Sequence, residues 1–277
     1  MIKFYKSRLL SDTSLVPQFE KEFSKYTGFE YGIAVDSCTS AIKLCLEYEK
    51  PAKVAIPTMT YVSVANEILH CGAELELLDE CYVNDSYNLQ GTCIWDCAHS
   101  VKKNDILSGN KYVKACYSFY PTKQVPSYQG GMICTNDIKF ATWARLARQM
   151  GRTGYGPYYD VEIIGWKCNM TPIQAFEGLE SLRRFKRKPH IHLWRIYVLD
   201  RDEFIKYMAM NGVECSIHFL PIHQKSAYLQ YDNEQFGATD YLIKHTVSLP
   251  WYPGIKSRDI KKIERLVASW RKYGNQN

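Results

Sequence analysis

Short runs of apolar, β-branched residues alternate in this sequence with stretches of helical periodicity, and this alternation constrains the fold more than any other feature. Tyr31–Val35 has the pattern of a buried strand, and Ala41–Tyr48 follows it with the pattern of a helix. The alternation continues through further strands predicted at Lys53–Ile56, Ala73–Leu78, Thr92–Trp95, Tyr112–Phe119 and Met132–Cys134. Strands that alternate with helices predict an α/β fold with a mainly parallel sheet sandwiched by helices.

The pattern changes in the last third of the chain. Helices are predicted over about residues 60–70, 137–150 and 172–185, and the last of these ends in a basic run. Beyond that run, strands at His192–Leu199 and Val213–Phe219 and helices at Arg201–Met210 and from Ser257 onward indicate a different arrangement. We therefore expect a large domain over residues 1–188 and a small C-terminal α+β domain over residues 189–277.

Composition excludes several classes of protein. With 277 residues and 46% hydrophobic content, the chain can bury a core without metal or disulfide support. Its ten cysteines form no CxxC pair and mostly lie in apolar runs, which is typical of reduced thiols in a cytoplasmic protein. No segment reaches the roughly 18 apolar residues of a membrane span, and the N-terminus lacks a stretch of signal-peptide length. We expect a soluble, cytoplasmic protein.

The net charge of +6 does not indicate a nucleic-acid partner. The densest basic run, Arg183–Lys188, follows a helical pattern, and cations favour helix C-termini. Neither an aromatic stacking platform nor a nucleic-acid motif accompanies it. A solvated helix end is the better interpretation.

Polar residues follow several of the predicted strands, where open α/β sheets bind their ligands. Asp36–Ser40 opens a helix and offers free N–H groups and hydroxyls, which suit a phosphate but equally an ordinary helix cap. Asp96 comes directly after an apolar strand, where an ionised carboxylate needs a partner. That partner is either a pyridinium nitrogen or a structural cap.

Two more segments carry the same kind of ambiguity. Lys123 follows a strand and a proline turn, so it is either a surface group or a partly desolvated amine whose lowered pKa allows a Schiff base. Tyr61, at the start of a predicted helix, either packs in the core or stacks on a flat ring.

Seven segments, taken in order, resemble the DegT/DnrJ/StrS family of sugar aminotransferases over nearly the whole chain. They are Asp36–Ala41, Pro57–Ala65, Asp96–His99, Ser118–Lys123, Gln129–Met132, Gly165–Ala175 and Gly212–His223. The resemblance implies the type I fold of pyridoxal 5'-phosphate transferases. It also implies amino transfer from an amino acid, by analogy glutamate, to a keto sugar that is nucleotide-linked, by a homodimer with shared active sites.

The resemblance implies a role for each matching residue. Lys123 would bind the cofactor covalently, Asp96 would pair with its ring nitrogen, Tyr61 would stack on the ring and His99 would approach its phenolic oxygen. The phosphate would be held by Thr39, Ser40 and Ser118. His218 would lie on the sugar side of the pocket.

The sequence departs from the family pattern in three ways. Cys38 replaces a glycine in the phosphate turn, which narrows the room for backbone approach. The connections at Glu80–Gly91 and Lys188–His192 are too short for blocks that the family normally contains, so we expect a smaller sheet. Lys167 and Asn169 stand where the family has the reverse pair. Either Lys167 lies at the phosphate and Asn169 near the donor carboxylate or sugar, or the loop has drifted and both side chains are solvated.

Three alternatives remain beside the aminotransferase. A sugar dehydratase of this family carries histidine at the position of Lys123, so the lysine counts against it. The two short connections leave open a catalytically silent cofactor-binding or regulatory homologue. A nicotinamide dehydrogenase is disfavoured because no G-x-G-x-x-G follows the first strand.

Overall fold

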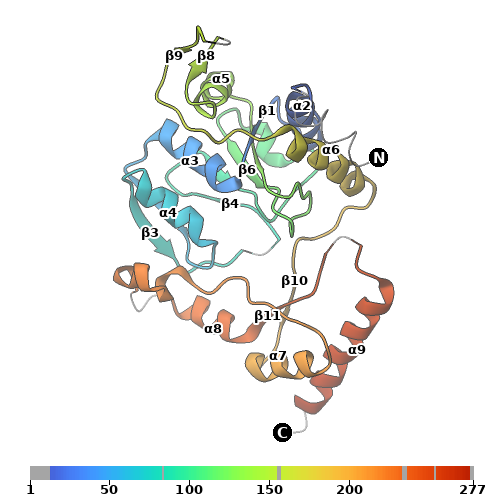
Figure 1. Cartoon of the computed structure of the whole chain (residues 1–277). Helices are drawn as coiled ribbons and strands as arrows, with labels where there is room; N and C mark the ends of the chain where they lie inside the picture. Colours follow the sequence, from blue (N-terminus) through green and yellow to red (C-terminus); the bar gives the residue numbers. More distant parts are fainter. Residues whose placement is uncertain (1–12, 83, 155–156, 233–235, 253, 275–277) are drawn as a thin grey trace. The chain divides into compact units, whose positions relative to one another are not determined.

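A computed structural model describes residues 13–82, 84–154, 157–232, 236–252 and 254–274 (Figure 1). Contacts divide it into two compact units. The first contains the described part of Met1–Ile56 together with Val62–Glu76 and Asp85–His190. The second contains Pro57–Tyr61, Leu77–Asn84 and the described part of Ile191–Asn277.

A five-stranded sheet forms the centre of the first unit, in the order β1-β7-β6-β5-β4. The strands are β1 (Tyr31–Val35), β4 (Tyr87–Asn88), β5 (Ile94–Asp96), β6 (Lys114–Ser118) and β7 (Gly131–Thr135). β5 and β6 are parallel, whereas β7 runs antiparallel to both of its neighbours and β4 runs antiparallel to β5. Thus β1, β5 and β6 share one direction, and the α/β class is confirmed.

Parallel neighbours are fewer than the sequence predicts, because two connections contain no crossover helix of the kind that joins parallel strands. The chain passes from β6 to β7 without a helix, through Tyr128 at φ 65° and Gly130 at φ 142°. β4 and β5 are joined by a turn that includes Gly91 at φ 91°. Both turns reverse the chain, so each places an antiparallel strand in the sheet.

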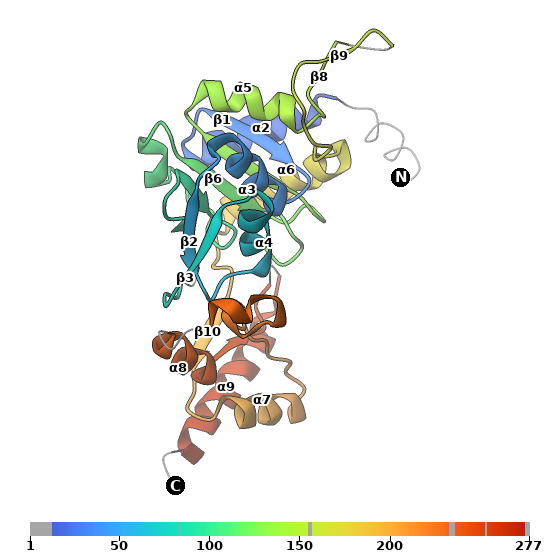
Figure 2. The same ribbon diagram turned by 90° about the vertical axis from the view of Figure 1, so that its left-hand side faces the viewer.

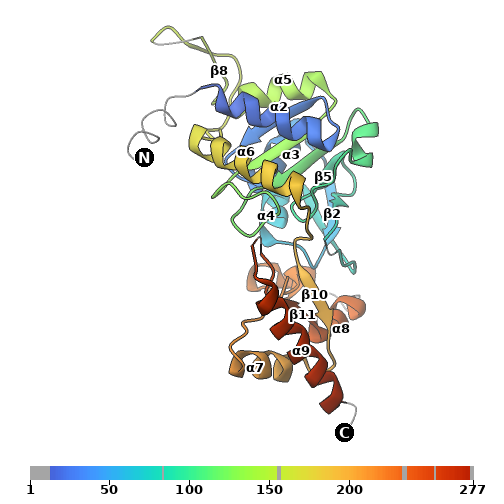
Figure 3. The same ribbon diagram turned by 90° about the vertical axis from the view of Figure 1, so that its right-hand side faces the viewer.

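Helices cover both faces of this sheet. On one face lie α2 (Leu15–Thr27) and α6 (Pro172–Arg187) (Figure 3), which bury an aromatic cluster with the strands. In this cluster the centroid of the Phe23 ring lies 5.0 Å from those of the Tyr117 and Phe119 rings. α6 begins at a capping box formed by Thr171 and Gln174. Arg183, Arg184 and Lys186 at its basic end are exposed and pair with half-buried glutamates, as expected for a solvated helix end.

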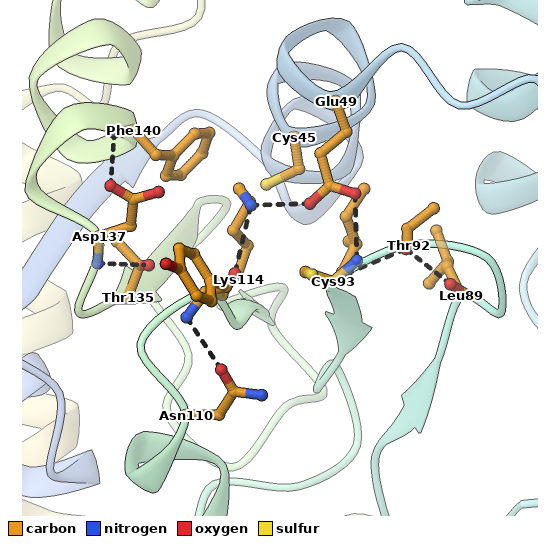
Figure 4. A network of polar contacts seen from close by, with 12 residues as sticks. Cys45, Glu49, Leu89, Thr92, Cys93, Asn110, Lys114, Thr135, Asp137 and Phe140 are labelled. Atoms are coloured by element: carbon orange, nitrogen blue, oxygen red, sulfur yellow. Dashed lines mark hydrogen bonds and ion pairs between the residues drawn. The ribbon is translucent and has the colours of Figure 1, made fainter.

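The opposite face is covered by α3 (Cys38–Glu49), with α4 (Val62–His70) beside it (Figure 2). Cys45 on α3 lies 3.7 Å from Cys116 on β6, measured between the sulfur atoms. At the C-terminal end of α3, Glu49 accepts a hydrogen bond at 2.7 Å from the buried Lys114 ammonium (Figure 4). α5 (Ile138–Ala147) packs beside β1 and α3.

Two short strand pairs complete this part of the chain. β2 (Lys53–Pro57) pairs with β3 (Glu74–Leu78), and Ala55 bridges to Gln90. β8 (Arg152–Thr153) pairs with β9 (Asp160–Val161). η1 (Ile106–Gly109) is a turn of 3-10 helix capped by Asp105.

The second unit contains a two-stranded antiparallel sheet with helices around it. β10 (Trp194–Tyr197) pairs with β11 (Thr246–Leu249), and the helical elements are α7 (Arg201–Met210), η2 (Ile222–Gln224), η3 (Ser226–Tyr231), α8 (Gly237–His245) and α9 (Ser257–Gly274). The strand predicted at Val213–Phe219 is wrong, because only Ser216 bridges to the sheet, at Ser248.

Candidate active site

Asp96 ends strand β5 and is almost fully buried, with 4% of its surface exposed. The Ala98 amide donates to its Oδ1 at 2.9 Å, and the Tyr87 hydroxyl donates to its Oδ2 at 3.1 Å. Burial raises the pKa of the carboxyl, while Ala98, the charge of Lys123 and Tyr87 act in the opposite direction. Both carboxylate oxygens are therefore held by protein donors.

Lys123 lies in the turn after β6, where its amide donates to the Tyr120 carbonyl at 2.9 Å. Its side chain is half-buried. Burial lowers the pKa of the Lys123 amine, and the nearby Asp96 and Cys38 favour its charged form. An amine and a carboxylate from the ends of two parallel neighbouring strands thus lie within electrostatic reach of each other.

The turn between β1 and α3 has the geometry of a helix cap. Ser37 is the N-cap, and its hydroxyl oxygen accepts from the Ser40 amide at 3.1 Å. Thr39 and Ser40 lie in the first helical turn and are half-buried. Of the two interpretations of Asp36–Ser40, the helix cap is therefore present. A cap does not exclude an anion at the same helix N-terminus.

A glycine of β7 lies against this turn. A Cβ atom at Gly131 would stand 2.6 Å from the Cys38 nitrogen and from the Ser37 oxygen, so only glycine fits there. Gly131 also pairs with Ser118 at the end of β6. Cys38 is half-buried, and its thiol donates to the Cys116 carbonyl at 3.5 Å. Ser118 and the α3 N-terminus therefore converge at one edge of the sheet.

This set of groups fits pyridoxal phosphate. It offers an amine with a lowered pKa, a buried carboxylate for a ring nitrogen and a helix N-terminus for a phosphate. His99 is buried in the turn that follows β5. Gly131 and Tyr87 are members that sequence reasoning did not single out. Gly131 lies within a matching segment, whereas Tyr87 lies within a connection that has no motif.

The Gly165–Ala175 segment runs beside the phosphate turn of its own chain. Asn169 bridges to Val35, and the Asp36 amide donates to the Cys168 carbonyl at 2.9 Å. Lys167 bridges to Gln149 at the end of α5. The side chains of Lys167 and Asn169 are both exposed.

Tyr61 and His218 belong to the second unit. The centroid of the Phe219 ring lies 5.7 Å from that of the Tyr61 ring and 5.2 Å from that of the His218 ring. With 56% of its surface exposed, Tyr61 is not a core residue of this unit.

The described residues contain neither a metal site nor a membrane-spanning helix. No group of three or more histidine, cysteine, aspartate or glutamate side chains is arranged to hold a metal ion there. Among the helices of those residues, none has both the length and the apolar character needed to cross a membrane.

Comparison with known families gives a match over nearly the whole chain. The model of the DegT/DnrJ/EryC1/StrS aminotransferase family matches residues 2–94, 83–197 and 187–268. The three matched segments meet at residues 83–94 and 187–197, which are the two places where the connections are short.

Individual proteins also match this chain over most of their length. The chain is 26% identical to the spore coat polysaccharide biosynthesis protein SpsC of Bacillus subtilis over 353 residues, which cover 95% of this chain and 91% of SpsC. It is 24% identical to the GDP-perosamine synthase of Caulobacter vibrioides, with 90% and 88% covered. The structure of the Streptococcus pneumoniae protein Spr1654 in its PLP form matches with a TM-score of 0.79 at 17% identity, with 96% and 94% covered. By its matched segments and its fold, the chain belongs to the DegT/DnrJ/EryC1/StrS aminotransferase family.

Proposed function

We propose that this enzyme transfers an amino group from an amino acid, by analogy glutamate, to the keto carbon of a nucleotide-linked sugar, with pyridoxal 5'-phosphate as cofactor. The observation that carries the proposal is that a half-buried Lys123 and a buried Asp96 lie within electrostatic reach of each other beside the N-terminus of α3. Family membership supports the reaction class.

Lys123 would bind the cofactor covalently and then act as general acid and base. When bound, the cofactor stores the amino group and withdraws electrons from the carbon that loses its proton. Released from the cofactor, the Lys123 amine would accept a proton from the α carbon of the donor and return it at the cofactor carbon. Burial lowers the pKa of this amine, so more of its neutral, proton-accepting form is present near neutral pH.

Asp96 would keep the ring nitrogen protonated. Its carboxylate is buried, and an unpaired buried charge is costly, so a protonated ring nitrogen is a favourable partner. Two protein donors already orient its oxygens.

The remaining site residues would hold the cofactor phosphate, the ring and the substrates. We assign the phosphate to Thr39, Ser40, Ser118 and Lys167, the ring to Tyr61 and His99, and the donor or sugar to Asn169 and His218. The α3 N-terminus supports the phosphate assignment through its free amides and helix dipole.

Borohydride reduction of the cofactor-loaded enzyme, followed by peptide mapping, tests this proposal. The pyridoxyl mass should appear on Lys123 and be absent from the Lys123→Ala variant, while Lys102→Ala, which changes an exposed lysine paired with Asp85, should keep it. A pyridoxyl mass on another lysine would overturn the assignment.

A second measurement separates the enzyme from a silent cofactor-binding homologue. Glutamate should remove the visible absorbance of the lysine-bound cofactor, and a panel of keto sugar nucleotides should restore it. An unchanged spectrum with glutamate and with other amino acids would show a silent binder.

A further inference from the structure

Tyr87 comes from the stretch of chain in which this protein differs from its family. The connection Glu80–Gly91 is shortened, and two matched family segments meet at residues 83–94. Within this shortened connection the chain forms the two-residue strand β4, which is antiparallel to β5. Tyr87 stands directly opposite Asp96 in this pair, so the two side chains lie on the same face of the sheet.

The hairpin that carries Tyr87 is firmly anchored. Asn88 donates through its side chain to the carbonyls of Thr92 and Ile94, at 3.2 and 2.9 Å. In Figure 4 the Thr92 hydroxyl donates to the Leu89 carbonyl at 2.6 Å, and Glu49 accepts from the Cys93 amide at 3.1 Å. These bonds hold the hairpin that carries Tyr87, and the Tyr87 hydroxyl itself donates to Asp96.

The phenol completes the set of groups around the carboxylate. Tyr87 is 7% exposed and donates to Oδ2, while Ala98 donates to Oδ1. Lys123 from the β6 turn, Cys38 from α3 and the neighbouring Cys97 are titratable groups that interact electrostatically with Asp96. Without the phenol, one carboxylate oxygen would lose its protein donor, and the plane of the group would be free to turn.

We propose that Tyr87 is a positioning residue for Asp96, which fixes the orientation of its carboxylate and stabilises its charge toward the cofactor ring. This inference rests on the proposed function. It assigns to the shortened connection a role within the active site.

Tyr87→Phe tests the proposal, because it removes only the hydroxyl. The affinity of the protein for pyridoxal phosphate, measured by absorbance titration without substrate, should fall about tenfold, as expected for a lost hydrogen bond to a charged group. The Tyr87 bond favours the ionised carboxylate, so its loss raises the pKa of Asp96. The acid limit of cofactor binding should therefore move to higher pH.

Tyr117→Phe is the matched control. Tyr117 is fully buried and packs against Phe23 in the core cluster on the α2 side of the sheet. This variant should leave both the affinity and the acid limit unchanged. In an Asp96→Asn background, Tyr87→Phe should no longer shift the acid limit, since the coupled group is absent.

The outcomes distinguish a failure of the role of Tyr87 from a failure of the proposed function. If Tyr87→Phe binds pyridoxal phosphate with the affinity and pH profile of the wild type, the role of Tyr87 is wrong while the proposed function stands. If the wild type does not bind pyridoxal phosphate, the proposed function itself fails.

Discussion

Burial acts in opposite directions on the two central groups of the candidate site. A low-dielectric environment disfavours charge, so it lowers the pKa of the Lys123 amine and raises that of the Asp96 carboxyl. Each group partly offsets this effect on the other, because their opposite charges attract.

The lowered pKa of Lys123 can be tested in the apo protein through the pH dependence of its reaction with an acetylating reagent. Competitive acetylation with mass spectrometry should show half-maximal reactivity of Lys123 at lower pH than that of an ordinary lysine, since only the neutral amine reacts. Lys53 is an internal control, because Glu76 and Glu74 raise its pKa. Its half-maximal reactivity should therefore lie at a higher pH than that of an ordinary lysine. A Lys123 midpoint equal to that of Lys53 would contradict the prediction.

Asp96→Asn should still bind the cofactor through Lys123 at saturating pyridoxal phosphate, although with lower affinity, and should lose most activity. The amide keeps the shape of the side chain but cannot hold a ring nitrogen protonated, so kcat should fall on the order of a hundredfold or more. Asp105→Asn is the control, since Asp105 is also buried but caps η1 through the Leu107 amide. An unchanged rate in Asp96→Asn would remove Asp96 from catalysis.

Sequence reasoning reached some of these residues and missed others for a physical reason. Asp96 ends strand β5 and Lys123 follows strand β6, and the ends of parallel neighbours meet at one edge of a sheet, so their proximity could be predicted. Tyr87 could not be predicted, because its place depends on the register of a two-residue strand that no periodicity reveals.

At the scale of elements, the approach of β7 to the first turn of α3 shapes the candidate phosphate site. Gly131→Ala places a methyl group 2.6 Å from the Cys38 nitrogen, so the turn must move. We expect pyridoxal phosphate affinity, measured by absorbance titration, to fall at least about tenfold, a loss comparable to that of one charged hydrogen bond.

Gly109→Ala provides the control for this element. No atom lies within 4 Å of the position of an added Cβ at Gly109, so the affinity should stay at the wild-type value. Wild-type affinity in Gly131→Ala would show that the turn adapts without loss to the phosphate site.

Element types were predictable where periodicity is long, as in α7 and α9, which begin at the expected residues Arg201 and Ser257. The directions of the strands were less predictable than the element types, because they depend on the geometry of the connections and not on the hydrophobic pattern. The residues Val213–Phe219 have the composition of a strand, yet they make a single bridge, since pairing requires a partner as well as a propensity.

At the scale of the whole molecule, the two short connections change length without removing a motif. The alignment with SpsC runs over 353 residues, more than the 277 of this chain, so the relative contains blocks that this chain lacks. The seven family segments all remain, and cofactor binding is expected to survive the loss.

We expect a homodimer, which sedimentation measures directly. Tyr158 and Ile164, in the segment around β9, are 92% and 93% exposed in the single chain, and exposed apolar side chains of this size favour a protein interface. A monomer that is fully active would refute the dimer.

Hybrid dimers then test whether the active site is shared. If Lys167 serves the site of the partner subunit, Lys167→Ala should weaken cofactor retention, and Lys123→Ala should abolish covalent binding. Mixing these two variants should restore activity at limiting cofactor, because each hybrid dimer contains one site with an intact Lys123 from one subunit and an intact Lys167 from the other.

If Lys167 instead serves its own subunit, as the bridge from Asn169 to Val35 would allow, both hybrid sites stay defective and activity does not return. A different affinity tag on each variant controls for exchange of subunits, since only the hybrid dimer carries both tags and can be isolated by two successive purifications. An isolated hybrid dimer that is as inactive as the two parent variants would contradict a shared site.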